Sequence, residues 1–263
     1  MNLVSFVTVN LNNADGLRRT LESLPYGKAT FEHVVVDGGS TDSSLDLLEP
    51  YRKFNLKVLS EKDSGIYNAM NKGIELASGD YLNFMNSGDC LVNLEVIDQV
   101  TNYSGPPVIW YGDRLTGRTK DLWQYASPIR LSMLVSDGGL SHQSQFIPRQ
   151  FFEDCGGYDE TFRIAGDWAW NIEAAVSHNK PFRHLGEVVC HFEGGGIGSP
   201  DSPDHWKVKK ERDEYLEQRL PWVLSDMQEL NSMRKKEQLQ KASGIYKFAE
   251  ALFRLKNRRT TKN

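Results

Sequence analysis

The sequence predicts an α/β fold with a mostly parallel central sheet, helices on both faces of that sheet and a helical extension at the C-terminus. Within residues 3–85, short apolar runs alternate with segments in which apolar residues recur every three or four positions. This β-α-β-α-β-α-β order is typical of parallel strands joined by helical crossovers. Residues 203–256 then have a largely helical pattern.

The elements of the first half follow from local patterns. Residues 3–10, LVSFVTVN, form an apolar run that predicts a buried strand. Residues 13–24 predict a helix, because Leu17, Leu21 and Leu24 fall on one face. In chain order there follow a strand from residue 31 that breaks at Asp37, a helix at 44–54, a strand at 56–61, a helix at 65–78 and a strand at 81–85.

The second half is more mixed. We expect a strand at 107–115, a strand and a short helix within 140–160, a helix at 165–178, and a strand from 181 that breaks into a glycine loop before 198. No internal repeat or low-complexity linker separates these segments. We therefore predict one catalytic-type domain over residues 1–202 and a helical extension over residues 203–263.

Polar clusters follow four of the predicted strands. Ligands of parallel sheets bind beyond the carboxyl ends of the strands, so we expect Asp37, Asp63 and Asp89 to face one crevice. A simpler interpretation is that these residues only form turns, where Asn, Ser, Gly and Asp are also common. The four clusters are residues 10–13, 37–40, 61–64 and 86–89.

Composition argues against several classes of protein. Hydrophobic residues make up 39% and charged residues 25% of the chain, as in soluble globular proteins. No apolar run is long enough to predict a transmembrane helix. The N-terminus, MNLVSFVTVN, lacks the basic region of a signal peptide and is interpreted as a first strand. Three distant cysteines, Cys90, Cys155 and Cys190, favour a reducing cytosol over a disulfide framework or a zinc site.

Charge is distributed unevenly along the chain. Residues 234–263 contain ten basic and two acidic side chains, whereas the first 233 residues contain 21 basic and 33 acidic ones. Residues 245–256 place Ile245, Phe248 and Leu252 on one face of a basic amphipathic helix. Such a helix is suited to an anionic membrane surface. The alternatives are a solvated terminal helix, or a helix that packs back on the domain.

Four segments stand out together: VVVDGGSTDSS (34–44), SEKDSGIYNAMNKGIELASGDYLNFMNSGD (60–89), SHQSQFIPR (141–149) and RIAGDWAWNIEA (163–174). In this order they resemble the inverting family 2 glycosyltransferases, which have a GT-A fold, a Rossmann-like sandwich. The resemblance is closest to bacterial members that build colanic acid, capsule and O-antigen repeat units. It implies that a sugar moves from a nucleotide-activated donor to an acceptor hydroxyl, with inversion at the anomeric carbon.

The resemblance implies a metal site at residues 86–89, in the place of the family's D-x-D motif. Asp89 would ligate Mn²⁺ or Mg²⁺, which neutralises the diphosphate leaving group. The first acid of the motif is Asn86 in this chain, and its amide oxygen can ligate a hard cation without adding charge. His191, just before a glycine-rich loop, is a candidate third ligand.

The resemblance also implies a donor site and a catalytic base. Asp37 would hold the nucleobase and ribose of the donor, with a UDP-sugar favoured and a GDP-sugar as the alternative. Asp167, at the start of the helix at 165–178, would remove the proton of the acceptor hydroxyl, although an Asp there can also be a helix cap. His142 and Trp168 would lie on the acceptor or diphosphate side, with structural packing as the alternative for both. The remaining donor-site candidates are Asn10, Asp63, Asn68, Asn71, Lys72, Asn86, Ser87 and Gly88.

The acceptors of such enzymes are usually polyprenyl-diphosphate-linked glycans. We therefore expect a cytoplasmic enzyme held peripherally on the inner face of the cytoplasmic membrane, with no nucleic-acid partner. A sugar nucleotidyltransferase is one alternative, but the segment VNLNNADG after the first strand lacks the basic glycine-rich loop of that class. An inactive glycan- or nucleotide-binding protein is another, and Asn86 is its only support.

Overall fold

The computed structural model describes residues 2–135, 139–196, 199, 202–203 and 205–242. The chain forms two compact units, Met1–Arg212 and Asp213–Asn263. The first unit therefore includes residues 205–212, which the sequence assigns to the helical extension. The basic segment 245–263 lies outside the described residues. Within the described part of the chain, no helix is long and apolar enough to cross a membrane.

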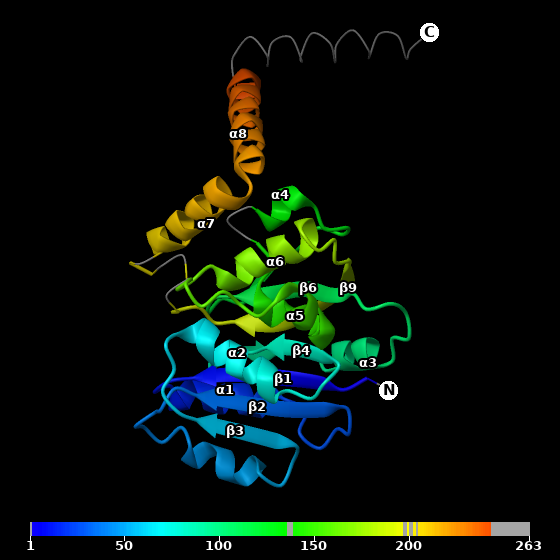
Figure 1. The fold of residues 1–263 in the computed structure, drawn as a ribbon, viewed down its shortest axis with the longest axis vertical. Coiled ribbons are helices and arrows are strands. Elements are labelled where there is room, and N and C mark those ends of the chain that lie inside the picture. Colours follow the sequence, from blue (N-terminus) through cyan, green and yellow to red (C-terminus); the bar gives the residue numbers. More distant parts are fainter. Residues whose placement is uncertain (1, 136–138, 197–198, 200–201, 204, 243–263) are drawn as a thin grey trace, which may run out of the picture. The chain divides into compact units, whose positions relative to one another are not determined.

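The strands of the described residues form one sheet with the order β3-β2-β1-β4-β8-β6-β9-β5, and β7 pairs with β6 (Figure 1). The strands β3, β2, β1 and β4 are parallel, as the alternating pattern predicts. The second half makes the sheet mixed, because β8 runs antiparallel to both β4 and β6. The strand bounds are β1 (Val4–Asn10), β2 (Phe31–Asp37), β3 (Leu56–Ser60), β4 (Tyr81–Phe84), β5 (Cys90–Leu91), β6 (Ile109–Thr116), β7 (Asp121–Trp123), β8 (Gln145–Pro148) and β9 (Phe182–Phe192).

Helices cover both faces of the parallel strands. Along β2, Val34 and Val36 pack in the cluster that contains Met70 of α2, whereas Val35 packs in the cluster that contains Leu17 of α1. This alternation follows from the two-residue period of a strand. The helix bounds are α1 (Ala14–Ser23), α2 (Ile66–Leu76), α3 (Glu95–Thr101), α4 (Leu131–Leu134), α5 (Arg149–Cys155), α6 (Gly166–Val176), α7 (His205–Arg219) and α8 (Pro221–Ala242).

The crossover between β2 and β3 differs from the prediction of a helix at 44–54. It contains only a 3₁₀ helix at Asp46–Tyr51. Pro50 lies inside this segment and has no backbone N–H to donate, which shortens the helix. Leu48 is still fully buried against α1. The apolar pattern that predicted the longer helix therefore still reports a buried face.

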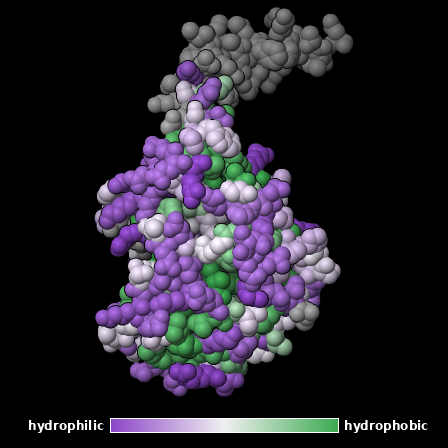
Figure 2. Space-filling view, in the orientation of Figure 1, coloured by the Kyte–Doolittle hydropathy of each residue, from purple (hydrophilic) through white to green (hydrophobic). Residues whose placement is uncertain are grey.

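Most of the apolar side chains of the first unit are inside it. Phe6, Phe84 and Phe146 are fully buried. The face in Figure 2 is accordingly mostly hydrophilic, with hydrophobic residues in small separate areas. Burial of the central strands on both sides explains why they have continuous apolar runs rather than alternating ones.

Candidate active site

A cleft of about 1160 Å³ opens beyond the carboxyl ends of β1 and β4. Its walls come from segments far apart in the sequence, which the sheet order brings together. They are the turn at 86–89, residues 139–143, the start of α6, the glycine-rich loop at 194–196 and the first turns of α7. Two of the predicted site carboxylates, Asp89 and Asp167, line this cleft.

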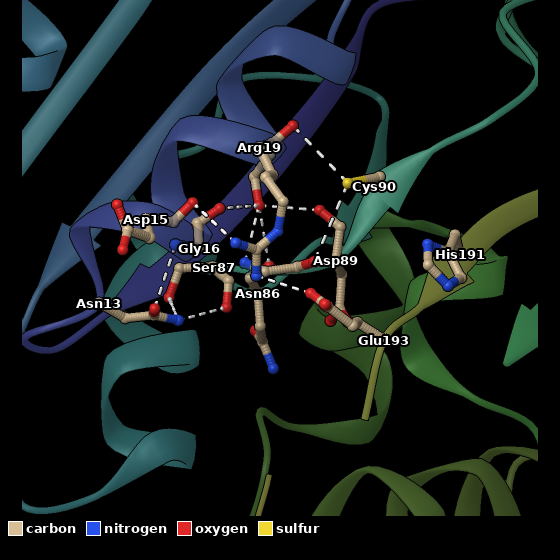
Figure 3. A network of polar contacts seen from close by, with 12 residues as sticks. Asn13, Asp15, Gly16, Arg19, Asn86, Ser87, Asp89, Cys90, His191 and Glu193 are labelled. Atoms are coloured by element: carbon tan, nitrogen blue, oxygen red, sulfur yellow. Dashed lines mark hydrogen bonds and ion pairs between the residues drawn. The ribbon is translucent and has the colours of Figure 1, made fainter. Parts of the chain in front are cut away.

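The turn after β4 places Asp89 in the cleft wall. The Thr20 hydroxyl of α1 donates to the Asp89 carbonyl oxygen at 2.8 Å and accepts from the Gly88 N–H at 3.0 Å. Gly88 has φ of +111°, a backbone conformation that favours glycine. Figure 3 shows this turn beside Arg19 of α1 and Asn13, the N-cap of that helix, and Asn13 Nδ2 donates to the Ser87 carbonyl oxygen. Helix α1 therefore fixes the turn that carries Asp89.

The Asp89 side chain is only 6% exposed. Gln143 Nε2 donates to its Oδ2 at 2.8 Å. Burial raises the pKa of Asp89 to about 6, because the charged form is desolvated, and the Gln143 hydrogen bond opposes that rise. A buried carboxylate with a raised pKa is a frequent feature of functional sites, where a cation can restore its charge.

The donor set of this turn fits a divalent cation that is shared with a phosphate ligand. Asn86 Oδ1 is buried and has no hydrogen-bond partner among the described residues. One carboxylate and one amide oxygen are enough where phosphate oxygens and water complete the coordination. Across the described residues, no group of three or more His, Cys, Asp or Glu side chains could hold an ion alone. His191 Nε2 donates to the Gly117 carbonyl oxygen at 2.9 Å, so this atom is not free to ligate a metal.

Asp167 lies in the first turn of α6, on the other wall of the cleft. Its Oδ1 accepts from the Tyr67 hydroxyl at 3.1 Å, and its Oδ2 lies 2.8 Å from His142 Nδ1. Burial acts to raise the pKa of Asp167, but the hydrogen bond from His142, with help from Arg212 and Tyr67, outweighs it and lowers the pKa. Asp167 is therefore ionised at neutral pH and can accept a proton.

His142 connects the two walls. It lies in a 3₁₀ turn, His142–Ser144, rather than at the start of the strand that the sequence predicts there. Asn86 Nδ2 lies 3.1 Å from His142 Nε2. The hydrogen-bond assignment that satisfies all partners has Asn86 donating to Nε2 and His142 Nδ1 donating to Asp167, which is the neutral imidazole.

Asp37 has a different environment from the one expected of a base-binding residue. It is 1% exposed and does not line the cleft. Its carboxylate accepts from Asn10 Nδ2 at 2.9 Å, from the Ser40 N–H at 2.8 Å and from the Ser60 hydroxyl at 3.0 Å. In this structure Asp37 and Asn10 join the loops after β1, β2 and β3.

The remaining predicted donor-site residues on and before α2 hold neighbouring loops. Asp63 Oδ1 accepts from the Gly65 N–H at the start of the helix. Asn68 and Asn71 each donate to Glu160 at 2.9 Å. Lys72 forms an ion pair with Glu61 at 2.8 Å. None of these four predicted residues, Asp63, Asn68, Asn71 and Lys72, is in the lining of the cleft.

Trp168 follows the candidate base and also lines the cleft, although only 2% of it is exposed. The Arg212 guanidinium lies 5.1 Å from the centre of its ring. Trp168 therefore packs inside the protein, as the alternative interpretation expects. Its contact with a sugar stays a prediction.

Sequence patterns did not indicate Glu211, although it holds the backbone just before Asp167. The Glu211 carboxylate on α7 accepts hydrogen bonds from the backbone N–H groups of residues 163, 164 and 165, at 2.9–3.0 Å. These groups lie at the N-terminus of α6, where a carboxylate is favoured by both hydrogen bonding and the helix dipole. Only contacts between distant segments identify it, since its own neighbours along the chain form an ordinary charged helix.

The charge of the cleft is positive in an otherwise acidic unit. Five arginines line it against three carboxylates. In the loop at 194–196, Gly194 and Gly195 have φ of +89° and +80°, backbone conformations that favour glycine. A cationic cleft beside such a loop suits an anionic, phosphate-bearing ligand.

The family model of glycosyl transferase family 2 matches residues 5–165. The chain belongs to this family. An uncharacterized glycosyltransferase of Mycobacterium tuberculosis is 34% identical over 211 residues, which are 76% of this chain and 78% of that protein. A PGL/p-HBAD biosynthesis glycosyltransferase of Mycobacterium bovis is 31% identical over 205 residues, 75% of this chain and 79% of that one.

Solved structures confirm the GT-A fold of this family 2 member. Staphylococcus aureus TarS in complex with UDP-GlcNAc has a TM-score of 0.65 at 19% identity and covers 81% of this chain. Mannosyltransferase PcManGT from Pyrobaculum calidifontis in complex with GDP-Man and Mn²⁺ has a TM-score of 0.59 at 15% identity, with 94% of this chain and 82% of that chain covered. The chain spans 42% to 66% of the TarS chains that it matches.

Proposed function

We propose that this family 2 enzyme transfers a sugar from a nucleoside-diphosphate donor to an acceptor hydroxyl, with inversion at the anomeric carbon. The observation that carries the proposal is the placement of Asp89 and Asp167 in one cationic cleft at the carboxyl ends of β1 and β4. A single displacement needs a base on the acceptor side and charge neutralisation on the leaving-group side. Asp167 would be the base on the acceptor side, and Asp89 would hold the cation that neutralises the leaving group.

The proton of the acceptor hydroxyl would pass to Asp167. The acceptor oxygen then forms the bond to the anomeric carbon as the bond from that carbon to the diphosphate oxygen breaks, and the nucleoside diphosphate leaves with the bonding electrons. The lowered pKa of Asp167 keeps it ionised and ready to accept the proton. Tyr67 and His142 hold the carboxylate from two sides, so its position is set before the acceptor arrives.

Asp89 and Asn86 would hold Mn²⁺ or Mg²⁺. The ion, when bound, would neutralise charge that develops on the leaving diphosphate. The fit of the donor set supports a divalent ion, and the Mn²⁺ named for the mannosyltransferase is consistent with it. We keep His191 as a candidate only through its second ring nitrogen, Nδ1.

The donor is a nucleotide-sugar in this proposal, and UDP and GDP are its leading nucleotides. The structural neighbours are named for complexes with UDP, UDP-GlcNAc and GDP-Man. One mycobacterial relative is named for PGL/p-HBAD biosynthesis, and we propose that this enzyme acts in the synthesis of a surface glycan. We propose a lipid-linked glycan as the acceptor and peripheral attachment to the inner face of the cytoplasmic membrane through the basic C-terminal segment; the charge pattern of residues 234–263 is the support for attachment.

The two alternative functions have less support. A sugar nucleotidyltransferase is disfavoured by membership of a glycosyltransferase family. An inactive binding protein would have no use for Asp167, which tertiary contacts hold in its ionised form inside the cleft.

A thermal-shift panel of UDP, GDP, dTDP and CMP, each with and without Mn²⁺, tests the proposal. A ligand that binds only the native state raises the melting temperature. We expect one nucleoside diphosphate to stabilise the protein, and to do so more strongly with Mn²⁺. A full panel without any stabilisation would contradict the proposed donor site and would favour the inactive protein.

A further inference from the structure

Arg114 lies on β6, the strand between β8 and β9. Arg114 lines the cleft. Its guanidinium lies between two aromatic rings, 5.6 Å from the ring centre of Trp123 and 5.6 Å from that of Phe192. Arg114 and Trp123 are directly opposite each other on β6 and β7. Trp123 of the short strand β7 therefore packs against one side of this guanidinium.

The arginines that line the cleft differ in their carboxylate partners. Arg19 is paired with Glu193 at 2.6 Å. Among the residues that the structure describes, no carboxylate lies within ion-pair distance of Arg114. Its Nε is buried and has no hydrogen-bond partner there. A buried N–H that lacks a partner costs free energy, so a guanidinium kept in this state points to an anionic ligand.

The sheet brings Arg114 near the predicted metal turn. Strand β9 lies between β6 and β5. Arg114 pairs with Cys190 on one side of β9, and Cys90, which follows Asp89, pairs with His191 on the other side. Two strand spacings of about 4.8 Å separate these backbones, a span that an arginine side chain can bridge toward a ligand held at Asp89.

The exchange of the first motif acid for Asn86 leaves this turn with one carboxylate, Asp89, and hence with less negative charge around a cation. A nucleoside diphosphate carries more negative charge than one divalent ion can balance, and the Asp89 carboxylate takes up part of that ion's charge. A guanidinium is planar, always charged and matched to two phosphate oxygens at once. Aromatic stacking fixes its plane without using its N–H groups.

We propose that Arg114 binds the diphosphate of the donor and stabilises it as it leaves. This inference rests on the proposed function, because it assigns a further residue to the leaving-group side of the same site. It also gives a role to Trp123, which is 44% exposed on a three-residue strand and packs against the guanidinium.

The test compares nucleoside diphosphates with the nucleoside alone, using the full-length chain with Mn²⁺. The variants are Arg114→Met and Arg114→Lys. The matched control is Arg183→Met, because Arg183 also lies over two rings, those of Tyr103 and Trp110, but does not line the cleft. UDP and GDP binding is measured by calorimetry, and binding of uridine or guanosine by ligand-observed NMR.

We expect Arg114→Met to weaken binding of the diphosphate about tenfold or more and to leave binding of the nucleoside unchanged. Arg114→Lys should recover part of the loss, since it restores charge without the planar fork. The control should bind both ligands like the wild type. If Arg114→Met does not fold, as judged by its melting temperature, Arg114→Lys carries the comparison.

Two results would overturn the inference. One is unchanged diphosphate affinity in both Arg114 variants. The other is an equal loss for diphosphate and nucleoside, which would mean that Arg114 only supports the shape of the cleft. A wild-type protein that binds none of the nucleotides would instead overturn the proposed function, so the two failures are distinguishable.

Discussion

His142 Nδ1 lies 2.8 Å from Asp167 Oδ2, and the opposite nitrogen of the same ring lies 3.1 Å from Asn86 Nδ2. One imidazole therefore joins the candidate base to the turn that would hold the metal and the diphosphate. The neutral imidazole satisfies both contacts with Nδ1 as donor and Nε2 as acceptor. This arrangement makes the protonation of Asp167 depend on a residue outside its own helix.

The base assignment predicts that Asp167→Asn reduces transfer by roughly 10²–10⁴-fold, the usual contribution of a general base. Donor binding should change little, because the base acts on the acceptor. Initial rates give the first quantity and calorimetry with the nucleoside diphosphate gives the second. A variant that loses donor binding as severely as transfer would contradict the assignment.

The His142–Asp167 contact predicts a shift in the pH profile. His142 lowers the pKa of Asp167 against the effect of burial. In His142→Gln this opposition is lost, the pKa of Asp167 rises, and the acidic limb of the kcat/KM profile should move to higher pH. His184→Gln is the matched control, since His184 pairs with Asp113 at 3.1 Å but neither residue lines the cleft. An unshifted limb in His142→Gln would refute the coupling.

Asp89 predicts how metal-assisted binding depends on pH. Because burial raises the pKa of Asp89 to about 6, its carboxyl is largely protonated below that pH and cannot ligate a cation. The extra stabilisation that Mn²⁺ gives to nucleotide binding should therefore decline as the pH falls through about 6. Asp89→Asn should show no Mn²⁺ dependence at any pH. Retention of the full Mn²⁺ effect in this variant would place the metal elsewhere.

We expect Glu211 to position Asp167 without contacting the substrate. Glu211→Ala removes the acceptor of three backbone N–H groups ahead of α6. We expect it to destabilise the protein by about 1–2 kcal/mol, the cost of a lost helix cap, and to lower kcat more than it raises the KM for the donor. Glu217→Ala is the control, because Glu217 is exposed on the same helix. Chemical denaturation and steady-state kinetics measure the two effects, and equal behaviour of both variants would argue against the role.

The charge pattern of the C-terminus predicts a change in fractionation. Deletion of residues 245–263 should move the protein from anionic vesicles to the supernatant without changing the melting temperature of the rest of the chain. A variant of the same length in which Lys247, Arg254 and Lys256 are replaced by Gln separates charge from length. Sedimentation with vesicles that contain anionic lipid provides the measurement. Unchanged binding after deletion would rule out this segment as the anchor.

Local patterns were sufficient for the parallel half of the sheet. The apolar runs around Phe6 and Val35 and the helical spacing of Leu17 and Leu21 predict β1, β2 and α1 to within a residue or two. These features depend on the periods of strands and helices, which are properties of neighbouring residues. The helix at 44–54 was the exception, since Pro50 limited the segment to a short 3₁₀ helix.

The sequence by itself determined the family and the fold class, and it singled out Asp89 and Asp167 as candidate site residues, because both belong to segments that are recognisable along the chain. Only the tertiary structure decided which polar residues share the cleft. Asp37 is taken up by hydrogen bonds among three loops, and Glu211 and Arg114 gain their significance from contacts with segments far away in the chain. Sequence patterns report the spacing of residues within an element, whereas a site is formed where the ends of different elements meet.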